Sequence, residues 1–126
     1  NIYVGLLRFI GLQCQGSATQ RHDMRFLERQ LMARVMPNNQ TLLAGLAELL
    51  QLDMRQNLQR LCCPMLWMRG AKDKLANVDV DALLSLNPLI RIHNTSEAAH
   101  VPFVSHPELF VDAVKCFLYE LRHDCI

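Results

Sequence analysis

The segment LCCPMLWMRGAKD, residues 61–73, decides the fold of this chain. Its apolar run, residues 65–68, is short and lies between Pro64 and Gly70, a pattern typical of a strand that is buried on both faces. Asp73 follows the C-terminal end of this strand. The segment therefore predicts a central strand with a carboxylate just beyond its end.

A second strand is predicted over residues 89–94, LIRIHN, where apolar and polar side chains alternate as in a half-exposed strand. Between the strands, Asn77 is expected to cap a helix over residues 78–86. Such a unit is parallel, and its right-handed crossover leaves both following loops at one edge of the sheet. His100 follows the second strand, so we expect it within hydrogen-bond reach of Asp73, roughly 2.6–3.2 Å, at the edge where open α/β sheets bind ligands.

Helical patterns precede and follow this α/β unit. A loose helical spacing covers residues 2–13, and a strong amphipathic pattern predicts a helix over residues 18–36. Residues 37–39 are expected to end that helix and cap the next, and the last helix is expected to begin at a Ser-x-x-Glu capping box, residues 105–108. The predicted apolar stripes are Met24, Leu27, Leu31 and Val35 in the first of these helices, and Phe110, Val114, Phe117 and Leu121 in the last.

The charge is unevenly distributed, although the net charge of the 126 residues is only +1. Residues 1–36 hold five arginines and two acids, whereas the remainder holds more acids than bases. Arg21, Arg25 and Arg29 recur every four residues on one helical face. This face is either an ordinary solvated surface or a site for an acidic partner, and the overall charge gives no indication of nucleic-acid binding.

The cysteines and the apolar segments indicate a cytoplasmic protein without a metal or cofactor. The five cysteines are irregularly spaced, and the adjacent Cys62 and Cys63 lack the spacing of metal ligands, so we expect reduced thiols. No stretch approaches the roughly 18 apolar residues of a membrane helix, and the first residues do not resemble a signal peptide.

Two parallel strands do not form a sheet that is stable in water. The strand over residues 65–68 requires neighbours on both edges, and the sequence predicts only one. We therefore expect either that the chain is the C-terminal part of a larger α/β protein or that a second copy covers the open edge.

An acid after one strand and a histidine after the next match the second and third members of a Ser-Asp-His triad. The carboxylate would orient the imidazole, and the imidazole would move the proton of a nucleophilic hydroxyl. The G-x-S-x-G pattern of the nucleophile is absent from the sequence. Considered alone, the pair Asp73 and His100 is also compatible with a structural histidine.

Three segments resemble the α/β-hydrolase family, and within it the carboxylesterases of biotin synthesis. Residues 64–73 resemble the family's P-x-L-x-L-x-G-x-x-D segment, residues 98–103 its A-x-H-x-P-x segment, and residues 53–58 its D-x-R-x-x-L segment. The Ser-His-Pro run at residues 105–107 also matches these esterases. The chain departs from the family at residues 75–77, where Leu-Ala-Asn replaces the frequent Leu-Val-Pro.

The resemblance implies a division of the chain and a set of site residues. Residues 1–52 would form a helical cap over the active site, and residues 53–126 the C-terminal part of the core. Asp73 and His100 would be catalytic, while the serine and the oxyanion hole would lie outside this sequence, so the chain alone would be inactive. The substrate-binding residues would be Phe9, Ile10, Gly11, Leu12 and Gln13, and Arg8, Arg21 and Arg25 would bind an acidic acyl-carrier protein that carries the ester.

Other functions stay open at this point. Dehalogenases, C–C hydrolases and acyltransferases share these motifs, and the residues that separate them lie outside the sequence. A non-catalytic helical binding module is an alternative of a different class. The remaining histidines, His22, His93, His106 and His123, are expected to be structural.

Overall fold

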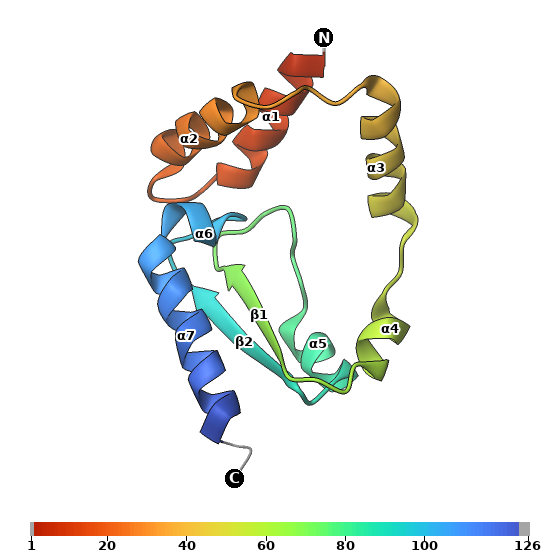
Figure 1. The fold of residues 1–126 in the computed structure, drawn as a ribbon, viewed down its shortest axis with the longest axis vertical. Coiled ribbons are helices and arrows are strands. Elements are labelled where there is room, and N and C mark those ends of the chain that lie inside the picture. The colour runs from red at the N-terminus through yellow and green to blue at the C-terminus, as the bar shows by residue number, and fades with distance from the viewer. Residues whose placement is uncertain (1, 124–126) are drawn as a thin grey trace.

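The computed structural model describes residues 2–123, which form a small parallel sheet with helices around it (Figure 1). The elements in order are α1 (Ile2–Cys14), α2 (Gln20–Met32), α3 (Asn39–Gln51), α4 (Arg55–Arg60), β1 (Met65–Gly70), α5 (Val80–Leu86), β2 (Ile90–Thr95), α6 (Pro102–Ser105) and α7 (Pro107–His123). No helix in this range is long and apolar enough to cross a bilayer.

The sheet consists of β1 and β2, which pair in parallel as the sequence predicts. The register runs from Met65 opposite Ile90 to Gly70 opposite Thr95. The amide of Ala71 donates to the carbonyl of Thr95 at 2.9 Å and extends the pairing past the strand ends. Both strands therefore end at the same edge, which carries the loops of interest.

The expectation that β1 is buried on both faces is wrong for the described chain. Residues 65–69 are only half-buried, and among the residues of β1 only Gly70 is fully buried. The reason is that β1 pairs with a single strand and, among the helices of residues 2–123, packs mainly against the short helix α6, which leaves much of its faces uncovered. The buried apolar residues are few: Cys14, Leu83, Ile90, Ala98, Ala99 and Val101.

Helices α1 and α2 form a hairpin beside α6, at the edge where the strands end (Figure 1). Helix α3 lies on the other side of the molecule and exposes much of its leucine-rich surface. Leu49 and Leu50 are 76% and 87% exposed. This surface, like the faces of β1, has the composition of a buried layer but is not buried within the described residues.

The bounds of α2 and the cap of α5 differ from the expectations. The helix predicted over residues 18–36 is shorter, Gln20–Met32, and Val35 beyond it is 97% exposed rather than part of a buried stripe. Asp79, not Asn77, caps α5, because its Oδ1 accepts from the amide of Ala82 at 3.1 Å.

The predicted capping box at the start of the last helix does not form. The hydroxyl of Ser105 donates to the carbonyl of Val101 instead, because Ser105 ends the short helix α6 that the sequence did not predict. The cap on α3 is as expected, since Asn38 Oδ1 accepts from the amide of Thr41 at 2.8 Å. The positions of the predicted stripe in α7 are half-buried.

Candidate active site

Asp73 and His100 lie in the loops that follow β1 and β2, and their side chains meet. His100 Nδ1 lies 2.9 Å from Asp73 Oδ2, within the expected range. The pairing follows from the topology, because parallel strands in register present their following loops at one edge. The histidine contacts a carboxylate through Nδ1, which leaves Nε2 for other chemistry.

The Asp73 carboxylate is held at both oxygens. Oδ1 accepts from the amides of Leu75 and Ala76 at 2.8 and 3.0 Å, while Oδ2 faces the imidazole. The side chain is only 6% exposed. Burial alone would raise the pKa of this carboxyl, but the Ala76 amide, the imidazole and the Leu75 amide outweigh burial, so its pKa lies below the usual value. The group is therefore a charged, fixed acceptor at neutral pH.

The imidazole of His100 is oriented but not enclosed. Its side chain is 38% exposed, and Nε2 has no hydrogen-bond partner among residues 2–123. Because the charged carboxylate of Asp73 can only accept, the neutral imidazole carries its proton on Nδ1 and its lone pair on Nε2. The arrangement can accept a proton from a group placed next to Nε2 and stabilise the resulting cation.

Two distant segments hold the backbone of the His100 loop. The amide of His100 donates to the carbonyl of Gln13 at the end of α1 at 3.0 Å, and the amide of Lys72 donates to the carbonyl of Ala98 at 3.0 Å. Gly70 lies so close to this loop that an added Cβ would be 2.0 Å from the Ala99 carbonyl oxygen. The sequence does not predict these contacts, because no local pattern indicates a bond between segments as distant as residues 13 and 100.

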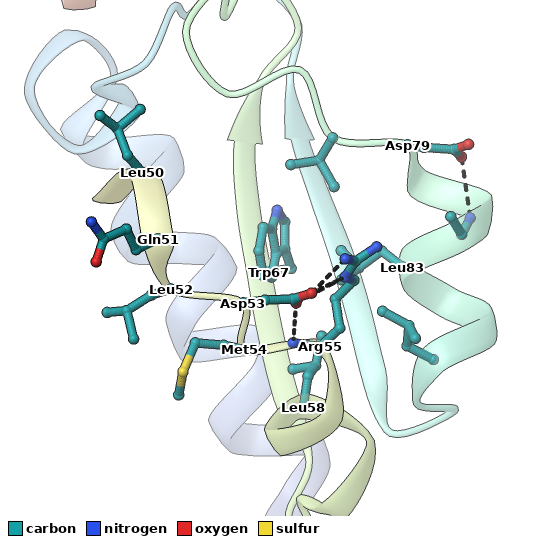
Figure 2. Close-up of a pocket in the computed structure, with 13 residues that line it drawn as sticks. Leu50, Gln51, Leu52, Asp53, Met54, Arg55, Leu58, Trp67, Asp79 and Leu83 are labelled. Atoms are coloured by element: carbon teal, nitrogen blue, oxygen red, sulfur yellow. Dashed lines mark hydrogen bonds and ion pairs between the residues drawn. The ribbon is translucent and has the colours of Figure 1, made fainter. Parts of the chain in front are cut away.

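An apolar groove of about 640 Å³ lies elsewhere, between the α3–α4 connection, β1 and α5 (Figure 2). Figure 2 shows Trp67 on β1, above the pair formed by Asp53 and Arg55 in this view. The Arg55 guanidinium and amide lower the pKa of Asp53 to about 2. Neither Asp73 nor His100 lines this groove, and no cluster of three metal-ligating side chains occurs in the described part of the chain.

No protein-family profile matches the sequence, but comparison with known proteins finds several relatives that share one name. The chain is 38% identical over 104 residues to the pimeloyl-[acyl-carrier protein] methyl ester esterase of Vibrio cholerae, a match to 82% of this chain and 41% of that protein. The esterases of the same name from Edwardsiella ictaluri and Proteus mirabilis are 40% and 34% identical, over 85% and 90% of this chain and 42% and 44% of theirs. The chain belongs to the α/β-hydrolase family. It corresponds to the C-terminal portion of these relatives and spans less than half of their length.

In this α/β-hydrolase chain, the segment predicted to bind substrate lies next to His100. Helix α1 (Ile2–Cys14) contains these residues in its C-terminal half, namely Phe9, Ile10, Gly11, Leu12 and Gln13, and the Gln13 carbonyl accepts from the His100 amide. Phe9 and Leu12 are 45% and 49% exposed, so they present apolar surface. Their role in binding stays a prediction.

The predicted carrier-binding arginines are all exposed. Arg21 and Arg25 lie on α2, where together with His22, Glu28 and Arg29 they line a shallow hollow. Arg8 lies on the neighbouring helix α1, outside the residues of that hollow. The basic character of the surface is therefore concentrated on α2.

The other histidines lie apart from the pair. His93 is half-buried in β2, and His106 Nδ1 lies 2.8 Å from the hydroxyl of Ser105. The ring of His123 contacts that of Tyr119. The thiols of Cys14, Cys62, Cys63 and Cys116 are free, and Cys125 lies outside the described residues.

Proposed function

We propose that Asp73 and His100 are the acid and the base of a Ser-Asp-His carboxylesterase. The observation that carries this proposal is the way the pair is bonded: Asp73 accepts hydrogen bonds at both oxygens, His100 is bonded at Nδ1, and its 38% exposed side chain has no bond at Nε2 among residues 2–123. Because the chain is similar to proteins named pimeloyl-[acyl-carrier protein] methyl ester esterase, the proposed substrate is the methyl ester of a pimeloyl group on an acyl-carrier protein. The enzyme would then act in biotin synthesis in the cytoplasm.

In each half of the reaction, His100 takes a proton as the base and returns it as the acid. His100 Nε2 takes the proton of the serine hydroxyl as its oxygen bonds to the ester carbon, and Asp73 stabilises the imidazolium. The imidazolium then gives this proton to the methoxy oxygen. Methanol departs, and the acyl group stays on the serine as an acyl-enzyme. Water then attacks the acyl carbon while His100 Nε2 takes its proton. The bond to the serine oxygen breaks, that oxygen receives the proton from His100, and the free acid is released. The serine and the oxyanion hole would come from the portion of the protein that matches the rest of the relatives.

Residues 1–52 would form the cap over this site, and residues 53–126 the C-terminal part of the core. The carbonyl of Gln13 bound to the His100 amide supports this division, because it places the end of α1 beside the reacting groups. The exposed apolar side chains Phe9 and Leu12 would then contact the acyl chain.

A chimera tests whether this chain supplies the acid and the base. In the chimera, this chain replaces the matched portion of the Vibrio cholerae relative, which provides the nucleophile. We expect it to hydrolyse the carrier-bound methyl ester, while the 126-residue chain alone shows no turnover above background. A folded chimera without esterase activity would contradict the proposal and favour a non-catalytic binding module. Transfer of the acyl group to an acceptor other than water would favour an acyltransferase instead.

The exposed arginines predict a salt-dependent interaction with the carrier protein. In the chimera, Arg25→Glu is expected to raise KM for the carrier-bound ester roughly tenfold at low salt, with little change in kcat, because carrier proteins are acidic. The difference should shrink as salt is added. Arg60→Glu on α4 makes the same charge change away from this surface and is the matched control. Equal effects of both substitutions would contradict a carrier site on α2.

A further inference from the structure

The turn between α1 and α2 contains a buried polar network that the proposed mechanism does not use. The carboxylate of Asp23 is fully buried. Its Oδ2 accepts from the hydroxyl of Thr19 at 2.7 Å and from that of Ser17 at 3.2 Å, and its Oδ1 lies 3.4 Å from His22 Nδ1. A buried carboxylate is costly unless donors satisfy it, so these bonds fix the conformation of the turn.

The turn itself has a tightly defined path. Gly16 has a φ of 94°, which favours glycine, and its amide donates to the side chain of Gln20 at 3.2 Å. Cys14 at the start of the turn is fully buried, and burial, followed by the charge of Asp23, raises the pKa of its thiol to about 11. Cys14, Ser17 and Asp23 are thus buried at this turn, while Gln15 and Ala18 between them are exposed.

The same turn bonds to the loop that carries His100. The carbonyl of Gln13 accepts from the His100 amide at 3.0 Å, and the amide of Ala18 donates to the carbonyl of Glu97 at 3.4 Å. Ala18 lies between Ser17 and Thr19, the two residues whose hydroxyls donate to Asp23, and Gln13 lies four residues before Ser17. The shape of the turn therefore determines where the backbone of residues 97–100 lies.

We propose that Asp23 is a positioning residue for His100. It closes the α1–α2 turn through Ser17 and Thr19, and the turn holds the His100 backbone so that Nδ1 reaches Asp73. The consequence for catalysis rests on the proposed esterase function. The positioning itself can be measured in the 126-residue chain without turnover.

The test removes one bond of the network with little change of shape. Thr19→Val keeps the branched side chain but loses the hydroxyl that donates to Asp23, and Thr19→Ser keeps the hydroxyl. Thr41→Val on α3 is the matched control, because only the backbone amide of Thr41 makes a cap bond. The readouts are amide hydrogen exchange, followed residue by residue, and the NMR signal of the His100 Nδ1 proton.

We expect Thr19→Val to speed exchange of the His100 and Ala18 amides about tenfold and to broaden the Nδ1 proton signal. Losing a hydrogen bond to a charged group changes the free energy of local opening by an amount that corresponds to about this fold-change. The amide of Ala71, bonded between the strand ends, should exchange as before. Thr19→Ser and Thr41→Val should resemble the parent chain.

Asp23→Asn provides a second variant with the same expected readouts. If Thr19→Val and Asp23→Asn lower the melting temperature while the His100 amide and the Nδ1 proton keep their parent behaviour, the network is only structural and the proposal is wrong. Uniformly faster exchange, including that of Ala71, would contradict it too. Because no outcome depends on ester hydrolysis, an inactive chimera would refute the proposed function and leave this result unchanged.

Discussion

Asp73→Asn in the chimera is expected to lower kcat by about 10⁴-fold, with the loop structure kept. The reason is that the two oxygens of the Asp73 carboxylate have different partners: backbone amides at Oδ1 and His100 at Oδ2. Two amides, of Leu75 and Ala76, donate to Oδ1, so the carbonyl oxygen of an asparagine would stay there and its amide nitrogen would face His100. The imidazole Nδ1 would then have to accept, which moves its proton to Nε2 and removes the base.

The control for this substitution is Asp79→Asn. Asp79 also accepts from a backbone amide, that of Ala82, but it has no bond to a histidine, so kcat should stay near that of the parent. His100→Ala should match or exceed the loss of Asp73→Asn. Steady-state hydrolysis of the methyl ester measures all three. An Asp73→Asn variant that keeps kcat within tenfold of the parent would contradict the assignment of Asp73 as the triad acid.

The positions that sequence could predict are those with a local or periodic signal. Residues 65–70 and 90–95 form strands where the apolar patterns predict them, and Asp73 and His100 meet because strand order and direction follow from the βαβ pattern. The family's motifs pointed to the same pair. The topology therefore brings two loops 27 positions apart to one edge of the sheet, where His100 Nδ1 and Asp73 Oδ2 lie 2.9 Å apart.

The misplaced caps show where local chemistry is ambiguous. Asn77 and Asp79 are both good capping residues, and only the path of the backbone decides that Asp79 caps α5. The Ser-x-x-Glu pattern at residues 105–108 is likewise present, but Ser105 belongs to the preceding turn of α6. A capping pattern indicates that a helix begins nearby, but it does not determine at which residue the helix begins.

The contacts that hold His100 could not be predicted, because they join segments far apart in the sequence. Gln13 acts through its backbone carbonyl, which does not depend on the type of side chain. The burial of Asp23 depends on tertiary packing, which no local sequence pattern indicates. The incomplete burial of β1 and α3 has a different origin. Their apolar composition fits a larger protein, and the chain spans less than half the length of its relatives.

Gly70→Ala is expected to disrupt the candidate site and to lower the free energy of unfolding by about 3 kcal/mol, the upper part of the range for an overpacked position. A Cβ atom at this position would lie 2.0 Å from the carbonyl oxygen of Ala99 and 2.3 Å from that of Ala98. Because these are backbone atoms of a buried loop, they cannot rotate away. The loop must shift, which would break the bond from the Lys72 amide to Ala98 and draw His100 away from Asp73.

Gly45→Ala is the matched control, and we expect it to raise the free energy of unfolding rather than lower it. Gly45 lies inside α3 with no atom within 4 Å of an added Cβ, so alanine should stabilise the helix by about 0.5–1 kcal/mol. Denaturant unfolding of both variants gives the two free energies, and the His100 Nδ1 proton signal reports the site directly. We expect that signal to disappear in Gly70→Ala and to persist in Gly45→Ala. A Gly70→Ala chain that unfolds no earlier than the parent, with the Nδ1 proton signal intact, would show that the His100 loop moves without cost and that Gly70 does not hold the pair in place.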